Sequence, residues 1–572
     1  MDKRSVKLPG WIFPVLLTVY SLLLVNQGVT VTDTGYNYGN FIHFESLDGM
    51  WKFSTYLATA IGSFFTKLPF GSTMLGLNVY TGLVKASIAL VTYFFCVKLF
   101  EMPKGVAFLA ELVALGFCWC PTALLYNYVT YLLFTLGTLL LCLAVKTGKT
   151  RWYVLAGVCL GVNVMVRLPN LAQMALILAV WFCCIIRRNS FGELLRRTGY
   201  CVLGYVLGFG SIFAYICVRY GFAAYVEGIR AILSMPGEAS DYSLKAMILG
   251  QLTDYLHNAK WILESAAVIG IGCVLFLLLK GRFLCWKRGL YVILNLALFY
   301  VFYRNKVFTF RYYDYSSIQN IGIVFLLMAI LLGGYAAFFG GKNYLLRFWG
   351  ACSVIVIGIT PLGSNNRLLS AENNLFVVTP FVFYCIYTLF GRSKQEYSEK
   401  AAVLLEPLRI SLVSLAALTA VQGILFGATF VFRDGIYGER RTEKVTEIPA
   451  LVGMYTQPAV AGQLKGLNAY LEAEGLKSRE VILYHNVPGL SFLLELTPAM
   501  SSTWPDLRSF ATEKFQRELA EISEGCEAGN RPMVIIGADA PTDQPKMEML
   551  LIFLEEENYR EDFSNELCTV YR

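Results

Sequence analysis

Long apolar segments separated by short polar connections fill the first three quarters of the chain. A helix needs about twenty apolar residues to cross the hydrocarbon core of a bilayer, so each run of roughly that length between charged or turn residues is a candidate span. The pattern predicts an α-helical polytopic membrane protein with about thirteen transmembrane helices. They cover residues 11–28, 75–98, 105–120, 124–145, 152–167, 170–186, 199–219, 261–280, 288–303, 316–339, 345–360, 375–391 and 409–432.

The hydrophobic pattern changes after residue 432. "QLKGLNAYLEAEG" and "FATEKFQRELAEISEG" have helical spacing, whereas "EVILYHN", "PMVIIGA" and "ELCTVYR" are short apolar runs typical of buried strands. Alternation of helices and strands favours a small α/β domain with a mostly parallel sheet. We therefore divide the chain into a transmembrane domain, residues 1–432, and a C-terminal α/β domain, residues 433–572.

Composition and charge agree with this division. The 572 residues are 56% hydrophobic and 15% charged, which excludes an ordinary set of soluble domains. Residues 1–432 carry 34 Lys and Arg against 17 Asp and Glu, and residues 433–572 carry 14 against 23. The basic excess of the first part is typical of membrane topology, so we predict membrane lipids and no nucleic acid as partners. The cysteine and histidine spacing shows no zinc motif.

The distribution of Lys and Arg also predicts the orientation. With the N-terminus in the cytoplasm, the connections containing "KTGKTR", "RRNSFGELLRR", "KGRFLCWKR" and "GRSKQEYSEK" all lie on the cytoplasmic side. The first outer loop, residues 29–74, and the acidic C-terminal domain then lie outside the cytoplasm. In the outer loop, "MWKFSTYLATAIGSFF" mixes aromatic and polar residues at helical spacing, which favours a helix in the membrane interface.

The outer connections hold a set of residues suited to sugar transfer from a lipid phosphate. Such a donor has a phosphate leaving group, so the reaction needs one base for the acceptor hydroxyl and cations for the developing charge. Asp33, in "TDTGYNYGNF", is the candidate base. Candidate phosphate partners are Arg167, Arg304, Lys306 and Arg311; candidate sugar contacts are Tyr36, Tyr126, Tyr312, Asn170, Asn373 and Asn374.

Each of these residues also has a structural interpretation. An acid close to a span end is often a solvated loop residue or a helix cap, and cations there often anchor at lipid headgroups. Lys85 and Glu111 lie within apolar runs, where a pair with each other is the simplest expectation. The sequence indicates no certain cofactor, and a divalent cation is one option. Glu45, Asp48 and His43 could hold a divalent cation with Asp33 or form the polar face of the interfacial helix.

The architecture and three short stretches resemble the GT-C membrane glycosyltransferases. "DTGYNYGNF" after the first span, "VRLPN" (166–170) and "TPLGSNNRLLSAENNLFVVTP" (360–380) are similar to the branch with protein O-mannosyltransferases and lipid A aminoarabinose transferases, including uncharacterised bacterial members. The resemblance implies a polyprenyl-phosphate sugar donor, an acceptor glycan, lipid or protein, and a role for Asp33 as the base. Many members have two adjacent acids, whereas Thr34 follows Asp33 here. Gly35 and Gly39 would let the backbone turn closely around the sugar.

Two other functions stay open at this stage. A polysaccharide polymerase or ligase acting on polyprenyl-linked glycans would depend on Arg304, Lys306 and Arg311 more than on Asp33. A transporter of lipid-linked glycans would show internal repeats and charged residues through several spans. The sequence contains one such charge pair and no clear repeat.

Overall fold

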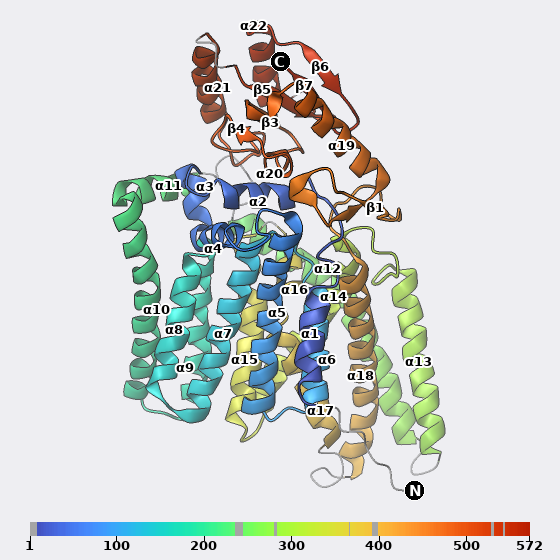
Figure 1. The fold of residues 1–572 in the computed structure, drawn as a ribbon. Coiled ribbons are helices and arrows are strands. Elements are labelled where there is room, and N and C mark those ends of the chain that lie inside the picture. The colour runs from blue at the N-terminus through green and yellow to red at the C-terminus, as the bar shows by residue number, and fades with distance from the viewer. Residues whose placement is uncertain are drawn as a thin grey trace.

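The protein consists of a bundle of membrane helices with a small sheet region at one end (Figure 1). The computed structural model describes residues 9–234, 244–278, 283–364, 366–391, 399–527, 531–541 and 544–572. Within these residues, eight helices are long and apolar enough to cross a membrane. They are α5 (Met74–Leu99), α7 (Leu125–Thr147), η1 (Leu168–Leu176) with α9 (Ile177–Ile186), α10 (Phe191–Tyr220), α12 (Leu244–Leu278), α13 (Leu284–Arg304), η4 (Tyr315–Ile318) with α14 (Gln319–Phe339), and α18 (Glu399–Thr429).

The other five of the thirteen predicted spans correspond to shorter helices, so eight of them have a helix that meets the length and hydropathy of a full span within the described residues. The five shorter helices have 10 to 16 residues, fewer than the roughly twenty that a perpendicular crossing needs. Proline accounts for several of the interruptions, because it removes a backbone donor and disfavours helix before it. Pro121, Pro169 and Pro361 each follow one of them. The five are α1 (Ile12–Ser21), α6 (Lys104–Phe117), α8 (Thr150–Val164), α15 (Tyr344–Ile359) and α17 (Val378–Gly391).

The two ends of the bundle differ in charge and structure. The turns from α7 to α8 and from α9 to α10 lie at the end away from the sheet (Figure 1), and they carry the basic segments 146–151 and 187–197. Two further basic connections, 280–288 and 391–400, fall in part on residues 279–282 and 392–398, outside the described residues. At the other end lie short helices between the bundle and the sheet. They are α2 (Asp33–Ile42), α3 (Gly49–Ser54), α4 (Tyr56–Thr66), α11 (Phe222–Ser234) and α16 (Leu369–Glu372).

The C-terminal region contains a five-stranded sheet with the order β4-β3-β5-β7-β6. Strand β3 is parallel to β4 and β5, but β7 is antiparallel to β5 and β6. The sheet is therefore mixed, which corrects the prediction of a mostly parallel one. The reason is local: β6 and β7 form a hairpin, and a short hairpin makes neighbouring strands antiparallel. The strands are β3 (Glu480–Tyr484), β4 (Thr497–Pro498), β5 (Met533–Gly537), β6 (Glu561–Ser564) and β7 (Cys568–Tyr571).

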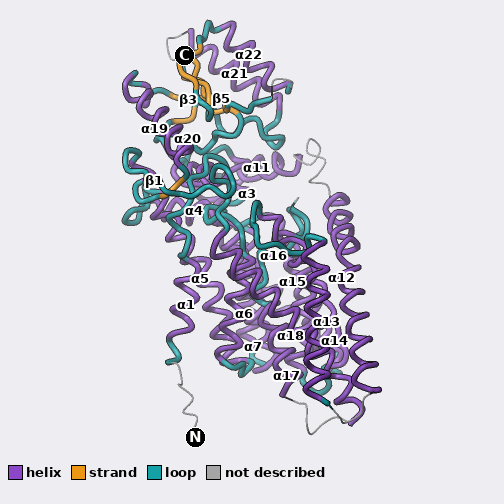
Figure 2. The backbone as a smooth tube through the Cα atoms, turned by 90° about the vertical axis from the view of Figure 1, so that its right-hand side faces the viewer, coloured by secondary structure: helices purple, strands orange, loops and turns teal. Residues whose placement is uncertain are grey.

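Helices cover both faces of this sheet, since the side chains of β3 and β5 alternate between two apolar clusters. One face packs on α19 (Pro458–Ala473) and α20 (Leu490–Leu493), and the other on α21 (Thr512–Glu527) and α22 (Pro545–Glu556). A separate two-stranded ladder joins β1 (Glu443–Lys444) to β2 (Tyr455–Thr456). Figure 2 shows the same arrangement after a quarter turn, with strands confined to one end of the molecule.

Two glycines of α2 connect the bundle to the sheet region. An added Cβ at Gly35 would lie 2.5 Å from Cα of Gly489, and one at Gly39 would lie 2.8 Å from the Ser491 hydroxyl. The amide of Gly489 also donates to the carbonyl of Val31 at 2.7 Å. Gly35 and Gly39 therefore permit close packing against α20. The expectation that they let the backbone turn around a sugar stays a prediction.

Candidate active site

Asp33 is the first residue of helix α2, where the free amides of the helix start favour a carboxylate. Its side chain is 31% exposed, and Oδ2 lies 3.5 Å from Nη1 of Arg433. Burial raises the pKa of the Asp33 carboxyl above its ordinary value, while Arg433 and the Asp33 amide act in the opposite direction. A carboxylate with a raised pKa accepts a proton more readily near neutral pH.

Arg433 is held opposite Asp33 by contacts on both sides of it in the sequence. The Thr30 hydroxyl donates to the carbonyl of Phe432 at 3.0 Å. The buried carboxylate of Asp434 accepts from the Val29 amide at 3.0 Å and forms an ion pair with Arg441 at 2.6 Å. These contacts tie the segment after α18 to the segment before α2. They bring Asp33 and Arg433, which are 400 residues apart in the sequence, into contact.

Aromatic rings lie beside this ion pair. The rings of Trp119 and Tyr315 stack with centroids 4.3 Å apart, and Tyr315 stacks on Phe432 at 6.1 Å. Tyr315 is close enough to Asp33 and Arg433 for both charges to act on it. The rings that stack on one another therefore form an aromatic wall next to the charged pair.

A cavity of about 120 Å³ opens next to these residues, between α1, α5, the 118–122 segment and the end of α18. Thr34, Trp119 and Phe432 line it, but Asp33 is not among the described residues that do. Lys85 lines it as well, and its Nζ donates to the carbonyl of Cys118 at 2.8 Å. This volume holds several water molecules or a group of phosphate size.

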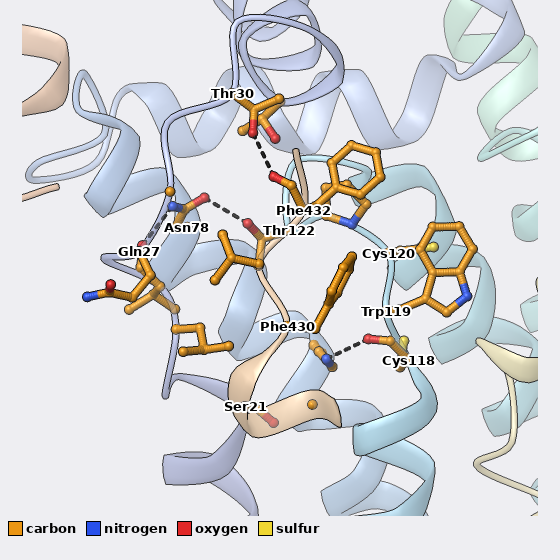
Figure 3. A pocket seen from close by; sticks show the side chains of 18 of the residues that line it. Ser21, Gln27, Thr30, Asn78, Cys118, Trp119, Cys120, Thr122, Phe430 and Phe432 are labelled. Carbon is orange, nitrogen blue, oxygen red and sulfur yellow. Dashed lines mark hydrogen bonds between the residues drawn. The ribbon is translucent and has the colours of Figure 1, made fainter. Parts of the chain in front are cut away.

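Hydrogen bonds fix the walls of the cavity. Asn78 accepts from the hydroxyls of Tyr38 at 2.5 Å and Thr122 at 2.7 Å, and it donates to the carbonyl of Val25 at 2.7 Å. In Figure 3, Gln27 and Asn78 lie on the opposite side of the cavity from Trp119. The walls therefore come from segments that are far apart in the sequence, and the hydrogen bonds of Asn78 hold these segments together.

The sequence pattern missed Lys85 and Arg433 as members of this site. Lys85 was expected to pair with Glu111, but both carboxylate oxygens of Glu111 are buried without a hydrogen-bond partner in the described part of the chain. The predicted pair is wrong because Lys85 turns toward the cavity instead. A lysine within an apolar run was the available signal. Nothing local marked Arg433, which reaches Asp33 only through the fold.

Tyr36 lies one turn after Asp33 on α2 but faces the sheet region. Its ring meets Trp51 and Trp504 edge-on, with centroids 6.4 and 5.5 Å apart. Burial raises the pKa of its hydroxyl to about 12, against hydrogen bonds to Asn40 and Ser502 that lower it. Tyr36 therefore joins α2 to the C-terminal region rather than lining the cavity beside Lys85.

Arg167, Tyr126 and Asn170 form a second group near the same end of the bundle. Arg167 donates to the carbonyl of Gly363 at 2.5 Å and to the Asn127 amide oxygen at 3.4 Å, and its guanidinium lies 6.0 Å from the centre of the Tyr126 ring. The buried amide of Asn170 donates to Thr130 and Asn163. Asn170 is thus held by the bundle, while Arg167 fastens the 361–364 segment to α7.

The cations of the 304–315 connection are exposed and lie outside both groups. Arg304 ends α13, the carbonyl of Lys306 accepts from Asn320 at 3.3 Å, and Arg311 donates to the Tyr313 hydroxyl at 3.4 Å. The buried Tyr312 donates to Gln422 at 3.2 Å. These side chains do not converge on Asp33; Tyr315 is the residue of this connection that reaches it.

Asn373 and Asn374 are buried and hold backbone and side chains in place. Asn373 accepts from the Cys120 amide at 3.0 Å and donates to the Leu369 carbonyl at 3.0 Å. Asn374 donates to the Thr360 hydroxyl at 3.2 Å. Asn373 therefore supports the 118–122 wall of the cavity, and a sugar contact of Asn373 or Asn374 stays a prediction.

The acids proposed as metal ligands beside Asp33 are occupied by cations. Glu45 pairs with Arg219 at 2.7 Å, and Asp48 pairs with Lys514 at 2.9 Å and caps α3. No group of three or more His, Cys, Asp or Glu side chains in the described ranges is placed to hold a metal ion. The interpretation of Glu45 and Asp48 as polar surface of the outer helices agrees with these contacts.

A second cavity, of about 750 Å³, lies in the C-terminal region. His485, which follows β3, has Asp506 3.4 Å from Nδ1 and Asp539 3.4 Å from Nε2. Burial raises the pKa of Asp506, against its contacts with His485. Trp504 lines this cavity and also meets Tyr36, so a single side chain separates it from helix α2.

Comparisons with known proteins give a likeness of architecture alone. No family model matches the sequence, and no curated protein sequence matches it. The Archaeoglobus fulgidus oligosaccharyltransferase is similar in its apo form, with 12% identity, a TM-score of 0.44 and coverage of 96% of this chain and 72% of that one. The complex of the same enzyme with Zn and sulfate is similar with 11% identity, a TM-score of 0.46 and coverage of 98% of this chain and 73% of that one. Arabinosyltransferase EmbB from Mycobacterium smegmatis is similar with 12% identity, a TM-score of 0.31 and coverage of 74% of this chain and 42% of that one. At these TM-scores nothing about residues or chemistry follows.

Proposed function

We propose that this chain is a membrane glycosyltransferase that transfers a sugar from a polyprenyl-phosphate donor to an acceptor at the extracytoplasmic face. The observation that carries the proposal is the placement of Asp33. It is a partly buried carboxylate 3.5 Å from Arg433, next to a cavity to which Lys85 contributes a cation. Transfer from a lipid phosphate requires one base for the acceptor hydroxyl and cations for the leaving phosphate.

The chemistry follows from the charges of these residues. Asp33 takes the proton of the acceptor hydroxyl as the acceptor oxygen bonds to the anomeric carbon of the sugar. The bond between that carbon and the phosphate oxygen breaks, and the electron pair leaves with the phosphate. Lys85 and Arg433 stabilise the negative charge that develops there. A glycosidase mechanism needs a second carboxyl group as acid, which this reaction does not.

The membrane orientation is part of the proposal. The basic turns at 146–151 and 187–197 lie at the end of the bundle away from Asp33. The positive-inside rule assigns that end to the cytoplasm, so Asp33 and residues 433–572 face outward. We assign residues 1–432 to the catalytic transmembrane domain. In the branch resembled, which includes protein O-mannosyltransferases and aminoarabinose transferases, acceptors are glycans, lipids or proteins, and any of these classes fits an outward site.

The polymerase or ligase alternative rests on Arg304, Lys306 and Arg311, and their surroundings do not favour it. All three are exposed, and Arg311 contacts Tyr313 rather than the cavity. A transporter would bind its cargo near the middle of the bundle. The cavity with Lys85 is lined instead by Thr30 and Thr34, at the start of α2, and α2 lies at the end of the bundle that bears the sheet (Figure 1).

The test is consumption of purified polyprenyl-phosphate sugars by the full chain in detergent or nanodiscs. We expect Asp33→Asn to lower transfer by about 10²- to 10⁴-fold, the usual contribution of a general base, without a change in expression. Glu45→Gln is the matched control, since Glu45 is another outer-end acid paired with an arginine; its transfer should stay near wild type. Near-normal transfer by Asp33→Asn rejects the assignment.

A further inference from the structure

The large cavity of the C-terminal region lies where the paths that leave two parallel strands separate. Strands β3 and β5 are parallel neighbours, with Tyr484 opposite Ile536 near their carboxyl ends. The chain after β3 enters α20 on one face of the sheet, whereas the chain after β5 enters α22 on the other face. Such a divergence leaves a crevice outside the strand ends, which is where ligands bind in open α/β sheets. His485 and Asn486, the first residues after β3, line the cavity at this point.

Polar contacts fix the residues that follow the two strands. The His485 amide donates to Oδ1 of Asp506 at 3.0 Å, and its ring Nδ1 lies 3.4 Å from Oδ2 of the same carboxylate. On the other side of the ring, Asp539 lies 3.4 Å from Nε2, and its Oδ2 accepts from the Asn486 amide at 3.1 Å. The crevice is therefore pre-formed, as small-ligand sites usually are, and its volume of about 750 Å³ is in their range.

Other side chains on the cavity are available to a ligand. Arg508, Glu513 and Gln544 line it and are exposed, and none of the three has a side-chain hydrogen bond or ion pair with another described residue. In contrast, Lys546 is used by the fold, since its Nζ donates to the carbonyls of Pro505 at 2.9 Å and of 507 at 2.8 Å. The available groups are thus a cation, an acid and an amide, whose charges cancel.

We propose that this cavity binds a neutral carbohydrate and, resting on the proposed function, that the carbohydrate is part of an acceptor glycan. Sugar hydroxyls both donate and accept hydrogen bonds, so they match the donors of Arg508 and Gln544 together with the acceptor oxygens of Glu513 and Gln544. An anionic ligand would meet the charge of Glu513, and a cationic ligand that of Arg508, and like charges brought together oppose binding.

The cavity is attached to the helices that form the outer end of the bundle. Trp504 lines it and meets the Tyr36 ring with centroids 5.5 Å apart. Tyr36 is three residues after Asp33 on α2, about 4.5 Å along the helix axis at 1.5 Å per residue. Lys514, next to Glu513, pairs with Asp48 before α3 at 2.9 Å. A glycan bound in the cavity is therefore held by a region fastened to the helix that carries the proposed base.

The experiment measures saccharide binding by the full chain and does not require transfer. Protein purified in nanodiscs is applied to an array of neutral oligosaccharides of glucose, galactose, mannose and arabinose, with uronic-acid and amino-sugar oligosaccharides on the same array. The dissociation constant of the strongest binder is then measured in solution. We expect that binder to be neutral. Arg508→Ala and Glu513→Ala should each weaken its binding by about tenfold, because each removes a hydrogen bond to a charged group.

Arg517→Ala and Glu524→Ala are the matched controls. Both residues are exposed on α21 and neither is among the described residues that line the cavity, so these variants should bind like wild type. The four substitutions are at exposed positions, and their unfolding midpoints should stay close to that of wild type. The proposal is overturned if wild type binds no neutral oligosaccharide, if it prefers charged ones, or if Arg508→Ala and Glu513→Ala both keep wild-type affinity.

The same measurements separate this inference from the proposed function. Sugar transfer by a protein that binds no oligosaccharide would refute the carbohydrate site and leave the transferase proposal standing. Oligosaccharide binding that depends on Arg508 and Glu513, without consumption of any polyprenyl-phosphate sugar, would support the carbohydrate site and overturn its role as an acceptor site.

Discussion

Two groups of cations lie at the sheet end of the bundle, and they differ in what surrounds them. Lys85 lines a cavity and Arg433 faces a partly buried carboxylate. Arg304, Lys306 and Arg311 are exposed on the 304–315 connection. A charge in a partly dehydrated site acts on a ligand far more strongly than one in water, because the effective dielectric constant is lower. Since Arg433 is itself 52% exposed, the comparison favours Lys85 above all as the cation that would stabilise the leaving phosphate in the proposed reaction.

The largest effect after that of Asp33 should come from Lys85. Lys85→Met keeps the length of the side chain and removes its charge, so the donor loses one charge-assisted hydrogen bond of about 1.5–3 kcal/mol. We expect kcat/KM for the polyprenyl-phosphate donor to fall by roughly 10- to 100-fold. Lys98→Met, at the exposed end of the same helix, is the control and should transfer normally. A wild-type kcat/KM in Lys85→Met would remove Lys85 from the site.

Arg433 should have a smaller effect on rate and a distinct effect on pH dependence. Arg433 is 52% exposed, so its removal should lower transfer by about two- to fivefold. Arg433 lowers the pKa of Asp33 against the effect of burial. In Arg433→Met that pKa rises further, and the acidic limb of the pH–rate profile should move to higher pH.

The conservative change Arg433→Lys provides the reference for this measurement. It retains a cation beside Asp33, and its acidic limb should stay near that of wild type. A limb that does not move in Arg433→Met, or moves to lower pH, would show that Asp33 is not the group whose ionisation limits the reaction.

Much of the fold could be predicted from the sequence because membrane helices are specified by local composition. Every predicted span has a helix, since apolar runs must satisfy their backbone groups internally. Where the sequence failed, the reason was geometric. A count of apolar residues predicts helices that continue to Pro121 and Pro169, whereas the helices end before these prolines. The last strand forms a hairpin with strand Glu561–Ser564, whose sequence is too polar to be recognised as a strand.

The candidate site was less predictable than the fold. Asp33 was identifiable because an acid at the end of an apolar run is locally visible. Its partner Arg433 lies 400 residues away, and the contacts of Thr30 and Asp434 that bring it there depend on tertiary structure. Asn170, Asn373 and Asn374 were predicted as sugar ligands, and the structure shows their amides bonded to backbone groups or, for Asn374, to the Thr360 hydroxyl. Residue type alone does not separate these two uses.

The smallest expected effect belongs to Arg311, and it gives the sharpest separation of the two groups. Its guanidinium contacts the Tyr313 hydroxyl at 3.4 Å and is exposed, so Arg311→Gln removes a charge that water and salt already screen. We expect kcat/KM for the donor to stay within about twofold of wild type. If Arg311→Gln instead lost as much activity as Asp33→Asn, while Lys85→Met retained it, the phosphate would lie on the 304–315 connection. That outcome would favour a polymerase or ligase that uses arginines over the single-base transferase.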